Sequence, residues 1–503
     1  MHSAVVGNHN VGPVLLGIDL GTSSVKAAVF DRAGRLLGRG LAPNHCLPGP
    51  PGSAEQDPQA WWLGCCRAVR AALAEAGVDP AGLAGIGVCG FHHCPVLLDA
   101  DGRPTRPAIV THDRRLGGSL EELRAGGVLD QVADVSGSQV VAGHFPPIYH
   151  YLLHHDPQSV ARSRWILLAK DYLRFRLTGR IGTEICDATG THLVAMPARD
   201  WSERLCDLLQ VDRARLPEIG EPAGIAGQVT PEAAAATGLP AGTPVVYGGG
   251  DSHCALLGLG VTGSGEVGLL LGTNSTLRAS FAGLPARGHE SHVVWVQQHV
   301  VPGRFTVSAS SMAGASVLSW FADTLLAGDQ TYADLEELAA GVPAGCDGLL
   351  FHPYIYGERS PFYDPQARGA FLGVAHWHTR GHFVRAVMEG VAFSIANCFD
   401  AIQAVAVARG EPIRVVRTGA GGGGRLPLWR QIIADALDLS LDVVDVPEPG
   451  CLGAAMLAGE GVGLPLPAAP AAGSQVCPNP GRARLYRDRR QAFNAAYAAL
   501  AAR

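Results

Sequence analysis

The sequence predicts an α/β fold made of two domains, and three observations support this prediction. The chain has 503 residues, about three times the usual length of a single domain. Apolar residues make up 47% of it and charged residues 17%, a composition that fills large cores and excludes a disordered chain. Predicted strands and helices alternate along both halves, as they do in α/β proteins. We expect the two domains to cover residues 1–244 and 245–503.

A strand-turn-strand pattern occurs twice, half a chain apart. The apolar run 14–19 leads into the turn Leu-Gly-Thr-Ser-Ser and a return strand over 25–30. Likewise, the run 266–271 leads into Leu-Gly-Thr-Asn-Ser and a strand over 277–281. A polar, Gly-centred tip between two short apolar runs is typical of a β-hairpin. The repeat predicts two domains built on one plan.

The other predicted elements follow in chain order. In the first half we expect a helix over 61–76, a strand over 83–89, a hairpin over 95–103 and a helix from Pro231 to Gly238, capped by Thr230. The segment 217–243, rich in Gly, Pro and Ala, is expected to connect the domains. In the second half we expect a helix over 379–407, a strand over 413–417, a helix over 428–437, a strand over 441–446, and helices over 452–460 and 488–503.

Charge and cysteine usage narrow the function classes. The net charge is −6, with no long run of like charge, so a nucleic-acid-binding surface is not expected. Twelve cysteines are too few for a disulfide scaffold in a chain of this length. The N-terminus lacks a basic start, and no uncharged apolar run reaches the roughly 18 to 20 residues that a membrane span needs. We therefore expect a cytoplasmic protein that binds neither nucleic acid nor membrane.

Asp19 ends the first predicted strand, directly before the turn of small residues at 20–24. A carboxylate in this place can hold a metal ion while N–H groups and hydroxyls of the turn bind phosphate oxygens. The pattern lacks the following helix and the Gly-Lys-Ser/Thr of a Walker site. The alternative is that Asp19 only caps its own turn.

A second carboxylate, Asp251, follows a strand and three glycines, Gly248 to Gly250. Three glycines leave space for a ligand, and a carboxylate beside them can accept a proton from a hydroxyl. The alternative is that Asp251 only caps the helix that begins near Ser252. We favour the functional interpretation, because a cap does not need the glycines.

The run Thr418 to Arg425 contains Gly-x-Gly-x-x-Gly between a predicted strand and a predicted helix. With Asp445 near the end of the next strand, it is compatible with dinucleotide binding and hence with an NAD-dependent oxidoreductase. A glycine wall against which a nucleoside lies fits equally well.

A separate motif, Cys89 to Cys94, places two thiols and two imidazoles within six residues and so suggests zinc. Structural zinc sites usually have a second Cys pair, which is missing here. We therefore favour a polar loop that offers His93 to a substrate.

Several motifs together make the sequence similar to the FGGY family of carbohydrate kinases, and most similar to its xylulokinases. The resemblance covers residues 15 to about 458. It rests on Asp-Leu-Gly-Thr-Ser from Asp19, Glu-Gln-Asp-Pro-x-x-Trp-Trp at 55–62, Lys-Asp-Tyr-Leu-Arg at 170–174, Gly-Gly-Gly-Asp at 248–251, Gly-Glu-Arg-Ser-Pro at 357–361, the segment 369–389 and Leu-Gly-Ala-Ala at 452–455.

The resemblance implies two ribonuclease-H-like domains of the actin-like ATPase type around a central cleft, with one carboxylate, Asp19 or Asp251, from each. It implies transfer of the ATP γ-phosphoryl group to a sugar hydroxyl, with Asp251 as catalytic base and Mg²⁺ held by Asp19 and Asp251. The remaining nucleotide contacts it implies are Gly21, Thr22, Ser23, Gly272 and Thr273 for phosphate, and Gly421, Gly422, Gly423 and Arg425 at the adenosine.

The sugar site departs from the xylulokinase pattern. Where that pattern has Gln-Met-His-Gly, this chain has Phe-His-His-Cys at 91–94, and where it has Trp-Asn-Asp-Gly-Arg, this chain has Thr-His-Asp-Arg-Arg at 111–115. We expect His92, His93, Asp113 and Asp251 to contact the sugar. The substrate predicted first is a ketopentose such as D-xylulose, phosphorylated at its terminal hydroxyl, with another ketose or a polyol such as ribulose, erythritol or glycerol as the alternative. A non-catalytic sugar sensor is the alternative of another class, and a homodimer is possible.

Overall fold

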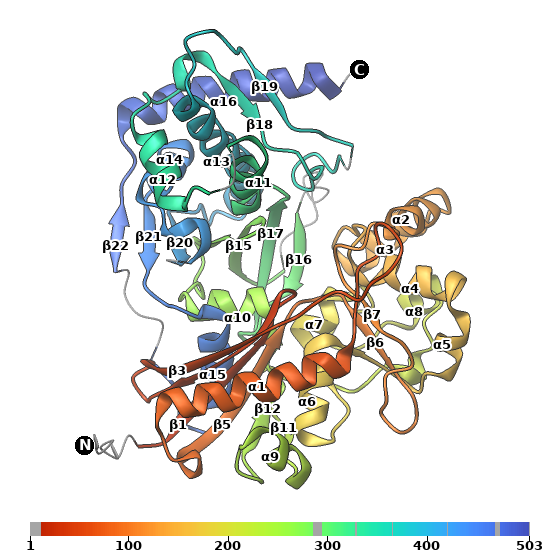
Figure 1. Ribbon diagram of the computed structural model, residues 1–503. Helices are drawn as coiled ribbons and strands as arrows, with labels where there is room; N and C mark the ends of the chain where they lie inside the picture. Colours follow the sequence, from red (N-terminus) through yellow and green to blue (C-terminus); the bar gives the residue numbers. More distant parts are fainter. Residues whose placement is uncertain are drawn as a thin grey trace, which may run out of the picture. The chain divides into compact units, whose positions relative to one another are not determined.

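The computed structural model describes residues 12–284, 294–326, 329–364, 366–419, 421–467 and 473–501 (Figure 1). The chain divides into two compact units. Unit 1 comprises Met1–Gly260, Gln297–Arg304 and Glu448–Ala469, and unit 2 comprises Val261–Val296, Phe305–Pro447 and Pro470–Arg503. The last two residues of the predicted C-terminal helix lie outside the described residues.

Unit 1 contains a mixed sheet whose strands follow the order β11-β12-β5-β1-β2-β3, with β13 also beside β5. The central strand β1 is antiparallel to β2 and parallel to β5, so the predicted first hairpin is confirmed. The bounds are β1 Val14–Leu20, β2 Ser24–Phe30, β3 Leu36–Pro43, β5 Leu83–Gly90, β11 Ile225–Gln228, β12 Pro244–Val246 and β13 Gly249–Gly250.

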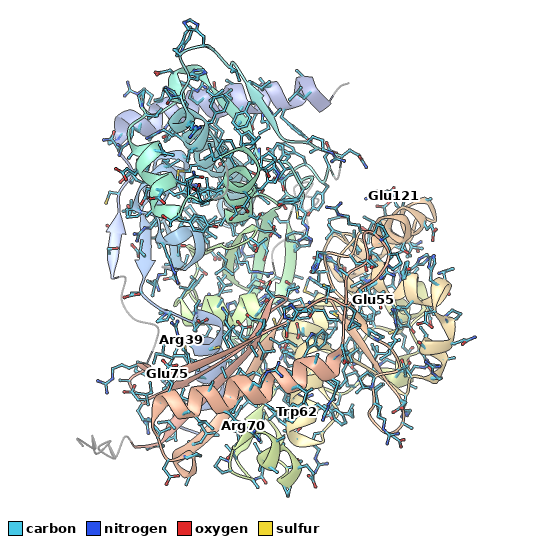
Figure 2. All side chains as sticks on the ribbon, viewed as in Figure 1. Arg39, Glu55, Trp62, Arg70, Glu75 and Glu121 are labelled. Atoms are coloured by element: carbon cyan, nitrogen blue, oxygen red, sulfur yellow. The ribbon has the colours of Figure 1, made fainter. Side chains whose placement is uncertain are left out.

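Helix α1 (Pro58–Ala76) covers one face of this sheet (Figure 1). Gly77, in the left-handed conformation, ends the helix where the sequence predicts, whereas the helix begins three residues before the predicted start, at Pro58, with Asp57 as its cap. The helix packs so closely on β3 that a Cβ at Gly40 would lie 2.0 Å from the Ala68 carbonyl oxygen. At the edge, Glu75 of α1 accepts a hydrogen bond from the Arg39 backbone of β3 (Figure 2).

Helix α15 (Pro449–Gly461) covers the opposite face of β1 and β5. A Cβ at Gly17 would lie 1.8 Å from the Cys451 carbonyl oxygen, and one at Gly87 would lie 1.9 Å from that of Ala454. Successive side chains of a strand point to opposite faces. Asp19 is therefore on the same face as Gly17, next to the N-terminal end of α15.

The rest of unit 1 forms a second core beside the sheet. Its strand β6 (Pro95–Leu98) pairs with β8 (Trp165–Leu168). After the Asp99 turn the chain returns along β6 and forms a single antiparallel bridge between Leu98 and Pro104, so the predicted hairpin is present with a short return arm. Around them lie α2 Leu116–Ala125, α3 Val128–Ser136, α4 Phe145–His155, α5 Pro157–Arg162, α7 Ile185–Gly190 and α8 Glu203–Leu208. Helix α6 (Ala169–Thr178) follows β8 and packs its apolar residues into the core of the sheet and α1.

Two expectations about domain organisation differ from the structure. The segment 217–243 is folded into unit 1, where it forms β11 and the predicted helix α9 (Pro231–Thr237), and does not serve as a free connection. The expected boundary after residue 244 falls inside unit 1, which continues through α10 (Asp251–Gly258) to Gly260. The cause is the packing of α10 on α15, where a Cβ at Gly453 would lie 1.9 Å from the Cys254 carbonyl oxygen.

Unit 2 is built around a sheet of order β16-β17-β15-β14-β20-β21-β22. Here β14 (Glu266–Leu271) is antiparallel to β15 (Ser275–Ala282) and parallel to β20 (Val415–Gly419). This pairing has the plan of β1, β2 and β5 and confirms the predicted repeat of the first hairpin. The remaining helices and strands are β16 Trp295–Gln298, β17 Arg304–Ser311, the pair β18 Leu350–His352 and β19 Ala370–Leu372, β21 Leu441–Val444, β22 Ser474–Val476, α11 Ala315–Leu325, α12 Tyr332–Ala340, α13 Arg380–Ala408, α14 Pro427–Leu437 and α16 Pro480–Ala501.

Helix α13 is the one described helix whose length and composition would allow it to cross a membrane. Most of its apolar window is buried inside the protein, with Val387, Val391 and Ile395 at 0% exposure. This is the pattern of a core helix, which passes the same test of length and hydropathy.

Candidate active site

The two predicted carboxylates lie at the same end of the unit 1 sheet. Strands β1, β5 and β13 run parallel, with Asp19 paired with Cys89 and Gly250 paired with Gly90. Asp19 precedes the last residue of β1, and Asp251 follows β13 as the first residue of α10. Ligands of α/β sheets bind outside the carboxyl ends of parallel strands. Because both carboxylates belong to unit 1, the expectation of one carboxylate from each domain is wrong.

Asp19 occupies a covered, charged environment. Burial, together with the nearby charge of Asp251, raises the pKa of Asp19 to about 7. Its Oδ1 atom is buried and has no hydrogen-bond partner among the described residues. Lys26 lies beside it and forms an ion pair of 3.0 Å with Glu448. Sequence reasoning missed Lys26 and Glu448, since only folding brings the segment before α15 to β1.

Asp251 is half-buried, with 35% of its side chain exposed. The three glycines before it are needed for close packing within the protein. A Cβ at Gly248 would lie 1.7 Å from the Val88 carbonyl oxygen, one at Gly249 would lie 2.3 Å from Val300, and one at Gly250 would lie 1.7 Å from the His92 ring. These glycines bring α10 against β5 and so set the position of Asp251, whereas the sequence suggested that they make room for a ligand.

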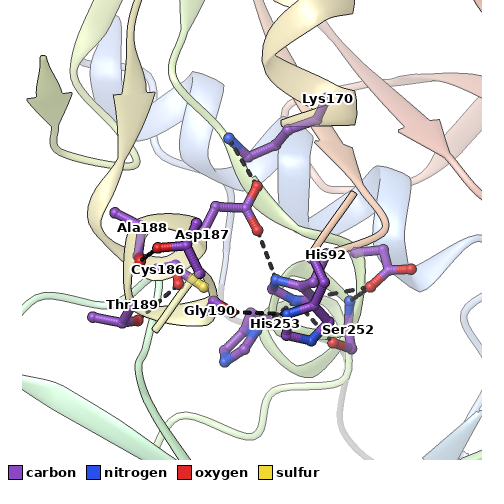
Figure 3. Close-up of polar contacts among 12 residues, drawn as sticks. His92, Lys170, Cys186, Asp187, Ala188, Thr189, Gly190, Ser252 and His253 are labelled. Carbon is purple, nitrogen blue, oxygen red and sulfur yellow. Dashed lines mark hydrogen bonds and ion pairs between the residues drawn. The ribbon is translucent and has the colours of Figure 1, made fainter. Parts of the chain in front are cut away.

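A fully buried ionic cluster lies next to this site. Lys170 Nζ is 2.7 Å from Asp171, 3.5 Å from Glu184 and 3.2 Å from Asp187 Oδ2. Asp187 Oδ1 in turn is 2.6 Å from His92 Nδ1 (Figure 3). Burial raises the pKa of Glu184 to about 8. Lys170 and Asp171 come from the Lys-Asp-Tyr-Leu-Arg motif, whose presence in the sequence was the available signal for this cluster.

The two neighbouring histidines have different surroundings. His92 is buried, with both ring nitrogens directed at protein groups, Nδ1 at Asp187 and Nε2 at Ser252 and His253. His93 Nδ1 is 2.8 Å from the Gly190 carbonyl oxygen, and its ring stacks on His144. Burial and the charge of His92 lower the pKa of His93 well below its usual value. A neutral His93 that donates from Nδ1 keeps Nε2 as an acceptor for a hydroxyl.

The other residues of this loop are structural. Phe91 is buried, with its ring edge-on to Trp61 at 5.6 Å. The Cys94 thiol is buried and donates a hydrogen bond of 3.0 Å to the Ile109 carbonyl oxygen. Within the described part of the chain, no group of three or more His, Cys, Asp or Glu side chains could hold a metal. A zinc site at 89–94 has no support.

Asp113 is held by protein groups on both of its carboxylate oxygens. Its Oδ2 accepts a hydrogen bond of 2.7 Å from the Ala54 N–H and lies 2.6 Å from Arg115 Nη2, which also binds Glu55, and its Oδ1 accepts a hydrogen bond of 2.9 Å from the Arg115 N–H. Its side chain is completely buried. This arrangement fixes the loop around 111–115 and argues against the direct contact with sugar that the sequence suggested.

The tip of the first hairpin carries the predicted phosphate-binding residues of unit 1. Asn44 donates a hydrogen bond to the Gly21 carbonyl oxygen, and Gln56 donates one to that of Thr22. Ser23 at the tip is exposed. These two contacts hold the turn that carries Thr22 and Ser23 next to the end of β1.

Unit 2 contains a pocket of about 550 Å³ at its own hairpin tip. Helix α11 begins there, with the Ala315 N–H donating to the Gly272 carbonyl oxygen and Ser316 Oγ donating to that of Thr273. A helix N-terminus favours negative charge. Of the predicted residues, Gly272 and Thr273 line the pocket, together with Ala315, Ser316, Ser319, Trp320, Asp323, Thr324, Tyr332 and Tyr356, which sequence reasoning missed.

The glycine run near the end of β20 lies at the same sheet end as this hairpin. A Cβ at Gly423 would lie 3.0 Å from Leu271, directly before the tip, while Gly421 has no neighbour within 4 Å of such an atom. The run forms a short 3₁₀ turn, Gly422–Arg425, and α14 begins only at Pro427, which has no N–H to offer a phosphate. This geometry favours a nucleoside wall over a dinucleotide-binding turn.

The carboxylates of unit 1 suit a Mg²⁺ ion. Mg²⁺ in phosphate-transferring sites is held by one or two carboxylates, with waters and phosphate oxygens as the other ligands. Asp19 provides a buried oxygen without a hydrogen-bond partner among the described residues, and Asp251 adds a second negative charge. A cation here would offset the repulsion and burial that raise the pKa of Asp19.

Two units with the same sheet plan, carboxylates at parallel strand ends and a pocket at the second hairpin are the layout of the actin-like ATPase fold, and the solved structure of a related kinase confirms this predicted fold class. Residues 14–258 match the N-terminal domain, and residues 269–461 the C-terminal domain, of the FGGY family of carbohydrate kinases. The chain belongs to this family and is a carbohydrate kinase.

The relatives include several xylulose kinases. The chain is 32% identical over 444 residues to the xylulose kinase of Escherichia coli K12, covering 88% of this chain and 89% of the relative. It is 30% identical over 452 residues to an L-xylulose/3-keto-L-gulonate kinase of the same organism, covering 89% of this chain and 88% of the relative. The solved structure of a "xyloylose kinase" from Brucella ovis is 30% identical to this chain and superposes with a TM-score of 0.87, covering 97% of this chain and 99% of that structure.

Proposed function

We propose that this protein transfers the γ-phosphoryl group of ATP to the terminal hydroxyl of a ketopentose such as D-xylulose. The observation that carries the proposal is the position of Asp251, half-exposed at the start of α10 and close enough to Asp19 to raise the pKa of that carboxyl. The xylulose kinases among the relatives support the substrate.

In this mechanism, Asp251 accepts the proton of the attacking hydroxyl as the phosphoryl group moves to the sugar oxygen. Thr22, Ser23 and Thr273 bind phosphate oxygens, and the pocket at α11 holds the nucleotide. Gly421, Gly422, Gly423 and Arg425 line the adenosine, and His93 Nε2 accepts a hydrogen bond from a sugar hydroxyl. Asp19 and Asp251 would hold Mg²⁺, which neutralises charge on the phosphate oxygens when bound.

A second substrate class is favoured by one observation. Thr111 and His112 replace the Trp-Asn of the xylulokinase pattern, so an apolar wall is lost and a polar side chain gained beside the sugar site. A different ketose or a polyol is therefore the second candidate. The relative that acts on L-xylulose and 3-keto-L-gulonate shows that similar chains differ in substrate.

The test is ADP release from ATP and Mg²⁺ over a panel of D-xylulose, L-xylulose, D-ribulose, 3-keto-L-gulonate, erythritol and glycerol. We expect the highest kcat/KM with a ketopentose. A higher value with a polyol or a keto acid would support the second candidate, and no stimulation by any of them would contradict the proposal.

We also place the enzyme in the cytoplasm, where ATP is available and where thiols stay reduced. All twelve cysteines are free, and ten of them are buried. A homodimer remains a prediction, which the mass of the protein in solution would check.

A further inference from the structure

A chain of three buried side chains ends at the helix that carries Asp251. It runs from Lys170 through Asp187 to His92, with 3.2 Å between Lys170 Nζ and Asp187 Oδ2 and 2.6 Å between Asp187 Oδ1 and His92 Nδ1 (Figure 3). The catalytic roles proposed above do not use these residues.

Asp187 fixes the orientation of the His92 ring. Burial alone would raise the pKa of Asp187, but the charges of Lys170 and His92 outweigh it and lower this pKa to about 2. The ionised carboxylate only accepts hydrogen bonds, so His92 Nδ1 carries the hydrogen between them. The other ring nitrogen, Nε2, is then directed at α10.

The first turn of α10 surrounds His92 Nε2. The distances from this atom are 3.3 Å to Ser252 Oγ, 3.2 Å to His253 Nδ1 and 4.0 Å to Asp251 Oδ1. The ring reaches the helix because residue 250 is glycine, where a Cβ would lie 1.7 Å from His92 Cε1. His93 on the same loop is the other titratable group that faces His92.

We propose that His92, held by Asp187, is a positioning residue that fixes the Asp251 carboxylate through the first turn of α10. The proposal rests on the proposed function, in which Asp251 is the base. A base displaced by about 1 Å can lose on the order of 10²-fold in rate, so the two contacts of His92 at Ser252 and His253 are enough to matter for turnover.

Two substitutions distinguish the roles of the two ring nitrogens of His92, Nδ1 toward Asp187 and Nε2 toward α10. His92→Asn can keep the donor to Asp187 but cannot reach α10, whereas His92→Gln places its amide near the position of Nε2. We expect kcat to fall by roughly 10- to 100-fold in His92→Asn and by less in His92→Gln, with the KM for ATP unchanged in both. His154→Gln, which changes an exposed histidine of the same unit, is the control and keeps kcat.

A coupling measurement tests the role of Asp187. In Asp187→Asn, Lys170 keeps Asp171 and Glu184 as partners, so the buried lysine stays compensated. We expect Asp187→Asn to lower kcat in the wild-type background and to add little in the His92→Asn background. Equal losses in both backgrounds would contradict the proposed chain.

Hydrogen exchange of residues 250–258, followed by mass spectrometry, gives a readout that needs no turnover. We expect faster exchange in His92→Asn than in the wild type and in His92→Gln. Unchanged exchange in His92→Asn, or equal kcat in the Asn and Gln variants at equal thermal stability, would overturn the proposal. If exchange responds as expected while the wild type phosphorylates no sugar, the proposed function fails and the positioning role stands.

Discussion

At the scale of single residues, the structure separates groups that face the site from groups that hold it. Asp19 and Asp251 could be predicted from the sequence because each lies at the end of an apolar run and adjoins small residues. The roles of His92 and Asp113 could not, since their partners Asp187 and Ala54 lie far away in the chain and outside the motifs. Polar residue type alone does not tell whether a side chain binds substrate or protein.

Substituting Asp19 should make stability less dependent on pH. Because burial and Asp251 raise its pKa to about 7, the folded protein keeps a proton that the unfolded chain releases above its ordinary pKa near 4. Stability therefore falls as pH rises from about 4 to 7, and the full cost is present above pH 7. We expect Asp19→Asn to raise the melting temperature more at pH 8 than at pH 5, without Mg²⁺.

The control for this experiment is Asp101→Asn, which removes a carboxylate that is 69% exposed. It should change the melting temperature little and equally at both pH values. A stabilisation by Asp19→Asn that is larger at pH 5 than at pH 8 would show that the environment of Asp19 is not the one described.

Substituting Asp113 should affect stability more than sugar binding. Asp113→Asn keeps the shape of the side chain but removes the charge that binds Arg115 and weakens the acceptor for the Ala54 N–H. We expect the free energy of unfolding to fall by about 1 to 3 kcal/mol, measured by urea denaturation. An unchanged free energy of unfolding together with a raised KM for the sugar would instead place Asp113 in contact with substrate.

At the scale of elements, glycines determine which helix can reach the site. The sequence predicted only a helix over 452–460. In the structure the small residues of α15 face backbone on both sides, at Gly17 and Gly87 of the strands and at Cys254 of α10. The helix pattern and its bounds could be predicted locally. Its return to the first unit could not, because that depends on shape matching between segments more than 350 residues apart.

A methyl group at Gly453 should disturb this packing. Its Cβ would lie 1.9 Å from the Cys254 carbonyl oxygen, and backbone cannot move aside as a flexible side chain does. We expect Gly453→Ala to lower the free energy of unfolding by about 1 to 3 kcal/mol. In contrast, Gly118→Ala in α2, where the added Cβ meets nothing within 4 Å, should be neutral or stabilising by up to about 1 kcal/mol. Equal effects of the two changes in a urea titration would contradict the packing described.

At the scale of the whole molecule, the repeated hairpin predicted two units of one plan, and the strand pairing confirms it. The halves are not equal in chemistry, however. Unit 1 carries both carboxylates, and unit 2 carries the pocket at α11. The sequence repeat showed the common scaffold but not this division of roles, because Asp251 and α15 join unit 1 through packing that has no local pattern.

The central claim is that Asp251 is the base of a sugar kinase, and one comparison tests it most directly. Sugar-dependent ADP release is measured for the wild type and for Asp251→Asn, with ATP binding checked for both by thermal shift. We expect the Asn variant to lose about 10²- to 10⁴-fold in kcat while its stabilisation by ATP stays nearly intact. A variant that binds ATP and keeps sugar-dependent turnover within tenfold of the wild type would contradict the claim.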